Sequence, residues 1–150
     1  MDPTDEQIEA ALRAAPDEAW RELAAALRDV EAEDRHATWS GGERVMTTVD
    51  GVERASTQLP YATYTEAVER FRRALAGAGA FVAFGWMQWD GRERYRDAEA
   101  LSAASVADAV RLVSAILRSE RFVEGAIEAA LDDGLLTGAA RRLLAWYDAG

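Results

Sequence analysis

The chain has 150 residues, enough for one domain to bury roughly 70% of the surface that its unfolded chain exposes. Its formal net charge of −10 disfavours nonspecific nucleic-acid binding, because an acidic surface repels phosphate backbones. All 17 positive side chains are Arg and there is no cysteine, which excludes lysine Schiff bases, thiol nucleophiles, disulfides and thiolate metal sites. We therefore expect a single domain over residues 1–150, without metal or cofactor.

The chain shows no targeting or membrane segment. Its first ten residues are acidic and lack the apolar stretch of a secretory signal, and its longest uncharged run, residues 74–89, is shorter than the roughly 20 residues that a spanning helix needs. These features predict a cytoplasmic protein that does not enter membranes. The lysine-free, Ala-rich, acidic composition has two explanations, a GC-rich genome or adaptation to high salt.

Two helices are expected at the start of the chain. Thr4 and Gln7 have the spacing of a capping box, so the first helix begins at Asp5. Pro16 suits the start of a second helix, in which apolar side chains recur three and four residues apart from Trp20 to Val30.

The pattern then changes to that of a small β-hairpin. Asp50-Gly51 lies between two runs rich in β-branched residues, from Val45 to Thr57, and Asp-Gly in such a position indicates a two-residue turn. Pro60 is expected to end the hairpin. Because two strands alone are marginally stable, we expect the hairpin to pack on helices or to gain a third strand from residues 81–84.

Helical patterns dominate the rest of the chain. Thr65 and Ser105 are expected N-caps, the first of a helix that ends near Gly77 and the second of an amphipathic helix that runs to Leu117. Two more apolar faces follow, at residues 122–131 and 136–147. The sequence therefore predicts a mainly α fold, a bundle of five to seven helices with a small β-hairpin inserted near residues 44–58.

The segment from Phe81 to Asp97 combines aromatic side chains with three Arg. Arginine forks beside Tyr and Trp suit an anionic small molecule or an acidic peptide. The alternative is internal ion pairing, of Arg94 or Arg96 with Glu120 or Glu124. Seven residues form the candidate site for a ligand or partner: Trp89, Arg94, Tyr95, Arg96, Arg118, Arg121 and Glu124.

Four carboxylates recur every four residues, at Glu120, Glu124, Glu128 and Asp132, as one stripe along an expected helix. Such a stripe can serve as a hard-cation site or an acid–base pair, or it can be the solvated face of an acidic protein. We favour the solvated face, because metal sites draw ligands from more than one element. We assign no catalytic residue and no metal ligand.

Three segments resemble a family of uncharacterised bacterial and archaeal proteins, the domain of unknown function 6508. They are PYATYTEAVERFRRAL, GAFVAFGWMQWDGRERYRDAEAL and ILRSERFVEGAIEAALDDG, and the resemblance covers Pro60 to Leu144. It implies a shared fold and a preference for aromatic, Arg or acidic residues at Trp86, Trp89, Arg121, Phe122 and Glu124. Members of the family tend to carry an acidic residue at the position of Gly85. The resemblance implies no reaction.

We expect a noncatalytic binding or interaction module with an aromatic and Arg surface. The first alternative is a small hydrolase or transferase that acts on an anionic small molecule, with Glu120 or Glu124 as general base and Arg121 as a clamp. The second is an acidic partner of a basic protein, suggested by charge alone.

Overall fold

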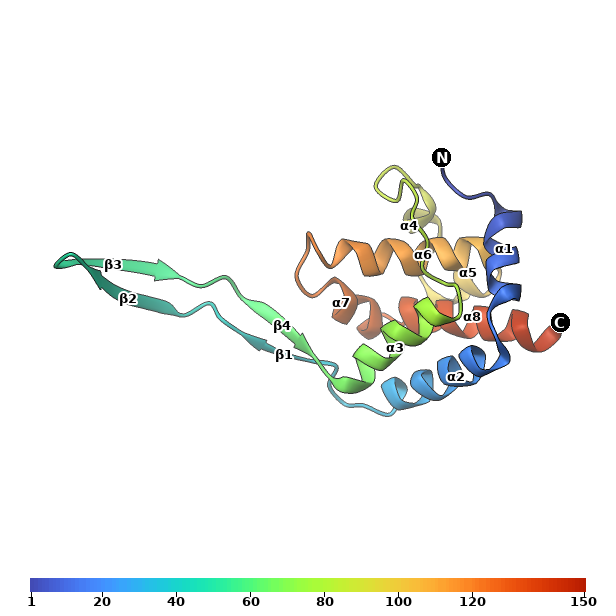
Figure 1. Cartoon of the computed structure of the whole chain (residues 1–150), viewed down its shortest axis with the longest axis horizontal. Coiled ribbons are helices and arrows are strands. Elements are labelled where there is room, and N and C mark those ends of the chain that lie inside the picture. Colours follow the sequence, from blue (N-terminus) through green and yellow to red (C-terminus); the bar gives the residue numbers. More distant parts are fainter.

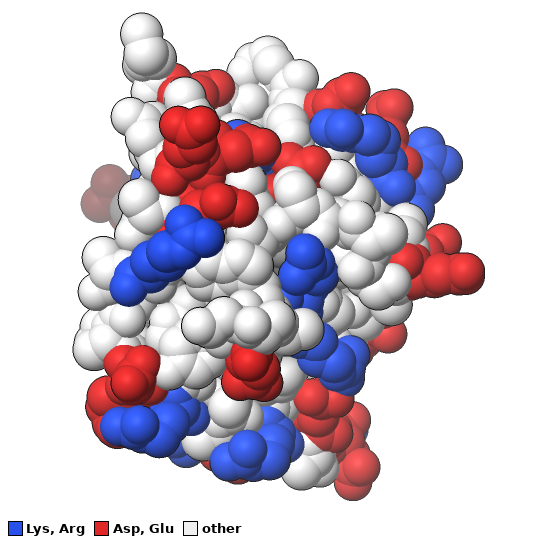
Figure 2. All heavy atoms as spheres, turned by 90° about the vertical axis from the view of Figure 1, so that its right-hand side faces the viewer, with Lys and Arg blue, Asp and Glu red and all other residues white.

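The computed structural model describes residues 1–150 and shows a helical body from which a long two-stranded arm projects (Figure 1). The arm leaves the body between α2 and α3, and both chain termini lie on the far side of the body from its tip. On the end of the body opposite the arm, acidic and basic side chains are interspersed (Figure 2).

The body contains eight helices, of which six have seven or more residues. The mainly helical fold with a small hairpin is therefore confirmed. The helices are α1 (Asp5–Ala14), α2 (Asp17–Glu31), α3 (Glu66–Gly77), α4 (Gly91–Arg94), α5 (Ala98–Ser102), α6 (Val106–Ser119), α7 (Ala126–Asp132) and α8 (Leu135–Ala149). None of them is both long enough and apolar enough to span a bilayer.

The expected helix caps are present. The hydroxyl of Thr4 accepts a hydrogen bond from the backbone of Gln7, whose side chain in turn accepts one from the Thr4 backbone. Thr65 and Ser105 cap α3 and α6 in the same way through their hydroxyls. Each cap satisfies a backbone N–H that a helix end leaves unpaired, which explains why these helices begin where they do.

One core holds the helices together. It comprises 29 buried residues from Ile8 in α1 to Leu143 in α8. Helix α6 is its centre, because α6 contacts α1, α4, α7 and α8, while α2 packs on α3 and α8. The apolar stripe of α6 is almost entirely buried, as its strong amphipathic pattern predicts.

The arm has two parts. Strand β1 (Ala37–Ser40) pairs with β4 (Tyr61–Tyr64) at its base, and β2 (Arg44–Val49) pairs with β3 (Val52–Thr57) in its outer half. Both pairs are antiparallel. The expected hairpin is confirmed, with a turn in which Asp50 and Gly51 have φ of 52° and 74°, the signature of a type I′ turn.

Two expectations about the hairpin are wrong. Pairing does not end at Pro60, because β4 follows it, and residues 81–84 form no strand. Glycines join the two parts of the arm: at Gly41, φ is 88° and an added Cβ would lie 2.5 Å from the carbonyl oxygen of Leu59. The outer half instead packs on nothing, since every residue from 42 to 60 is exposed.

Candidate functional site

The seven candidate residues lie in three separate places. Trp89, Arg94, Tyr95 and Arg96 belong to the loop around α4, Glu124 contacts the base of the arm, and Arg118 and Arg121 line a hollow beside α3. The structure therefore does not bring them together in one site.

The α4 segment is held by contacts within itself. Trp89 packs edge-on against Phe84 and lies beside Tyr95, with ring centroids 5.7 and 6.3 Å away. Arg94 pairs with Asp90 at 3.0 Å, and the Nε of Arg96 donates to the Glu93 carbonyl. The expected ion pairs from Arg94 or Arg96 to Glu120 or Glu124 are wrong, because both guanidinium groups bond within the α4 segment instead.

A polar cluster fixes this segment to α6. Tyr95 donates its hydroxyl to Asp108 at 2.5 Å, and Arg111 bridges Asp108 and Asp5 at 2.8 and 2.5 Å. Burial, together with the bond to the Asp108 carboxylate, raises the pKa of Tyr95. Tyr95 thus anchors the segment on the body.

The carboxylate of Glu120 organises the loop between α6 and α7. It accepts hydrogen bonds from the Tyr64 hydroxyl at the base of the arm, from Gly125 N (2.8 Å) and from Ile127 N (3.0 Å). Burial and the bond to Glu120 raise the pKa of Tyr64. A loop carboxylate thereby joins the arm to the helical body.

Two more carboxylates of the expected stripe have the same function. Glu124 accepts from the backbone N–H of Ala62 in β4 at 2.7 Å, and Glu128 accepts from the Trp39 indole in β1 at 2.8 Å. The indole lies over Gly125, where a Cβ would come within 2.5 Å of it. The stripe is not one helical face, because α6 ends at Ser119 and α7 begins at Ala126. Three of its carboxylates instead bind the base of the arm.

A basic hollow of about 520 Å³ lies between α3 and the end of α6. Four Arg and one carboxylate line it, together with Phe81 and two smaller apolar side chains. On α3, Glu69, Arg72, Arg73 and Ala76 share the spacing of one helical face. We define these lining residues as the Arg hollow: Glu69, Arg72, Arg73, Ala76, Phe81, Leu117, Arg118 and Arg121.

Two cations of the Arg hollow have no acidic partner. Arg72 pairs with Glu69 at 3.4 Å and Arg73 with Glu66 at 2.9 Å. Arg118 and Arg121 make no ion pair. The guanidinium of Arg118 lies 4.8 Å from the centre of the Phe81 ring, and its Nε is buried without a hydrogen-bond partner in the protein. A buried, unpaired donor is costly, which makes it a feature to be explained.

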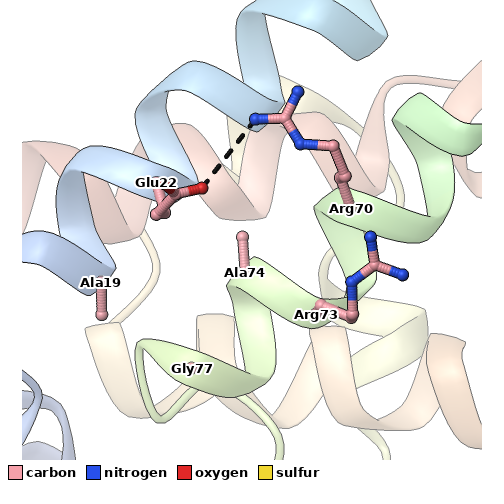
Figure 3. Close-up of a pocket in the computed structure, with 6 residues that line it drawn as sticks. All are labelled: Ala19, Glu22, Arg70, Arg73, Ala74 and Gly77. Carbon is pink, nitrogen blue, oxygen red and sulfur yellow. Dashed lines mark ion pairs between the residues drawn. The ribbon is translucent and has the colours of Figure 1, made fainter.

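A second hollow, of about 290 Å³ between α2 and α3, has no such excess of positive charge. Glu22 of α2 faces Arg70 of α3 across it at 3.9 Å (Figure 3). Arg70 also pairs with Asp29 at 2.9 Å, and Arg73, on its rim, pairs with Glu66. Its cations are thus matched by carboxylates, unlike Arg118 and Arg121. No group of three or more His, Asp or Glu side chains gathers in the structure as metal ligands would.

Comparison with known proteins identifies the family. Residues 15–149 match the Family of unknown function (DUF6508). The chain belongs to this family. The match covers α2 to α8 and the arm, more than the segment from Pro60 onward that the resemblance indicated. No curated protein and no solved structure matches the chain.

The sequence predicted two of the four lining Arg, Arg118 and Arg121, as site residues. It did not predict Arg72, Arg73 or Phe81 as members of the site. The signal that could have revealed the two Arg was their position on the polar face of α3, directly after the buried Phe71. Which second element this face would meet could not be read from the sequence.

Proposed function

We propose that the protein is a noncatalytic module that binds a small anionic molecule in the Arg hollow, within a chain that folds as one domain. The observation that carries the proposal is the unpaired state of Arg118 and Arg121 beside two further Arg, in a chain whose net charge is −10. In such a chain, carboxylates are abundant enough to neutralise these cations. Arg118 and Arg121 nevertheless have no acidic partner, which leaves them available to an external anion.

The lining also indicates the chemistry of the ligand. Two of the four guanidinium groups are paired, that of Arg72 with Glu69 and that of Arg73 with Glu66, so two positive charges are left over. Guanidinium groups bind carboxylate and phosphate in a bidentate way. Phe81 adds an apolar wall beside Arg118. A dianion with two carboxylate groups, or a phosphate ester, fits these features.

No observation favours the catalytic alternative. A general base must be able to accept a proton from a substrate. The carboxylate of Glu120 already accepts three hydrogen bonds from the protein, and Glu124 accepts one from β4. Both hold the arm, which supports a binding function without catalysis.

The test is binding of pyrophosphate and of citrate, measured by calorimetry at low ionic strength. Loss of a hydrogen bond to a charged group is worth about 1.5–3 kcal/mol, so Arg118→Gln or Arg121→Gln should weaken binding by roughly 10- to 150-fold. Arg28→Gln is the matched control, since Arg28 is an exposed Arg on α2 without an ion pair. If neither anion binds the wild-type protein, or if Arg28→Gln weakens binding equally, the proposal is wrong.

A further inference from the structure

The outer half of the arm has two free edges. Strands β2 and β3 pair only with each other, and every residue of both strands is exposed. An isolated two-stranded hairpin is marginally stable in water, and a strand edge presents unpaired N–H and C=O groups on which another strand can add. Pairing with a further strand would therefore stabilise the outer half of the arm.

The turn determines which backbone groups are free. In a two-residue turn at Asp50-Gly51, Val49 and Val52 are the hydrogen-bonded closing pair. Thr47 is the next residue of β2 that bonds to β3, and its hydroxyl also reaches the Arg54 carbonyl. Met46 and Thr48 alternate with these residues, so their backbone groups point outward from the free edge of β2.

We propose that the free edge of β2 pairs antiparallel with the same edge of a second copy of this chain, with Thr47 on the twofold axis. A twofold axis perpendicular to a sheet places one residue opposite its own copy. With Thr47 there, the outward backbone groups of Met46 and Thr48 face each other across the axis and hydrogen-bond in pairs. Val45 then lies opposite the second copy's Val49.

Charge selects this register. With Thr47 on the axis, Arg44 lies opposite the Asp50 side chain of the second copy. By symmetry, Asp50 lies opposite the second copy's Arg44, so the dimer contains this pair twice. Opposite charges and β-branched pairs across strands are each stabilising. Moving the axis to Met46 removes both pairs, since Arg44 then faces Thr48.

The edge of β3 is less suitable. An axis at Glu53 or at Arg54 places two like charges directly opposite each other, which is destabilising, and an axis at Ala55 pairs Glu53 with Thr57 and Arg54 with Ser56, so that no opposite charges meet. The edge of β2 carries no charge between Arg44 and Asp50. The comparison favours β2 over β3 as the pairing edge.

The resulting dimer removes the weakness of the single arm. Four strands, in the order β3, β2, β2 and β3, form one sheet, and Val45, Val49 and Val52 of both copies share one of its faces with Thr47, Arg54 and Ser56. A sheet of three or more strands can be stable where a single hairpin is not. Each turn ends opposite Arg44 of the other copy, outside its β1 and β4, so the helical bodies stay apart.

The absence of cysteine gives a direct test. In the proposed register, Thr47→Cys places two thiols in a pair without backbone hydrogen bonds, where Cα atoms lie about 4.5 Å apart and a disulfide can form. Arg54→Cys is the matched control, because Arg54 lies directly opposite Thr47 on β3. The two thiols that Arg54→Cys introduces would be three strand spacings apart, about 14 Å.

Under mild oxidation, Thr47→Cys should form a disulfide-linked dimer, whereas Arg54→Cys should form no disulfide between the two copies. Equal cross-linking of both variants, or faster cross-linking of Arg54→Cys, would overturn the proposed register. In light scattering, the wild-type chain should be a dimer at about 100 μM, a concentration at which weak dimers form. A wild-type monomer at that concentration would overturn the proposal itself.

Proline provides a second matched pair. Thr48→Pro removes an outward N–H from the β2 edge, whereas Glu53→Pro removes one from the β3 edge at the same cross-strand position. Thr48→Pro should abolish the dimer and Glu53→Pro should retain it. Arg44→Glu should raise the dissociation constant about tenfold, because the introduced carboxylate would face that of Asp50. The opposite pattern would exclude β2 as the interface. None of these outcomes depends on anion binding in the Arg hollow.

Discussion

Replacing Gly125 by Ala tests whether the base of the arm is docked on the loop between α6 and α7. Gly125 has φ of 86°, and the added Cβ would lie 2.5 Å from the Trp39 indole. Gly134 provides the control, since its φ is 80° and nothing lies within 4 Å of its Cβ position. Both glycines directly precede a helix, so both variants carry similar backbone strain.

The expected magnitudes differ between the two positions. A left-handed conformation costs a residue with a Cβ about 1 kcal/mol, which is the whole expected effect of Gly134→Ala. At Gly125 the methyl group must also displace the indole, which breaks the hydrogen bond from Trp39 to Glu128 and adds about 2 kcal/mol. Gly125→Ala should therefore cost about 3 kcal/mol, the sum of these two effects.

Urea unfolding followed by far-ultraviolet circular dichroism measures these free energies. In a Trp39→Ala background, the cost of Gly125→Ala should fall to about 1 kcal/mol, because no indole remains to be displaced. Equal costs for Gly125→Ala and Gly134→Ala in the wild-type background would refute the reasoning. They would mean that the indole does not lie on this loop in solution.

Three further predictions follow from the electrostatics. The pKa of Tyr64 is raised in the folded state, so above about pH 10 the unfolded chain loses the hydroxyl proton of Tyr64 before the folded chain does, and the free energy of unfolding falls as the pH rises. Tyr64→Phe should make that fall shallower. Tyr61→Phe, which removes a hydroxyl without a hydrogen bond, should leave the fall unchanged. Asp108→Asn should cost about 2 kcal/mol in urea unfolding because it leaves Arg111 half-buried with a weakened partner, whereas Arg94→Gln, at an exposed pair, should change stability by less than about 0.5 kcal/mol. If the acidic composition reflects salt adaptation, the melting temperature should rise steadily with KCl concentration, and greater stability in dilute buffer would exclude that origin.

Local signals in the sequence predicted the elements of the fold well. Hydroxyl caps at Thr4, Thr65 and Ser105 and the Asp50-Gly51 turn involve residues at most three positions apart, and all four are present. The outer strands were predicted for the same reason. The base of the arm was missed because β1 and β4 are separated by 20 residues, and each is only four residues long.

The candidate site depended on long-range contacts, and these could not be read from spacing. Glu120 and Tyr64 lie 56 residues apart, so a carboxylate stripe with a structural function resembled a solvated face. Arg118 and Arg121 were identified by type. The α3 side of their hollow became visible only once α3 was known to pack beside the end of α6.

The two ends of the arm are held together by hydrogen bonds where they join α2 and α3. Thr65 bonds to Glu33 through its hydroxyl and to the His36 carbonyl through its N–H, so α2 and α3 are tied together before the strands diverge. A shorter or different hairpin could therefore replace residues 41–60 without moving any helix. The proposed dimer interface and the proposed anion site would then depend on separate parts of the chain, the first on the hairpin and the second on the helices that carry it.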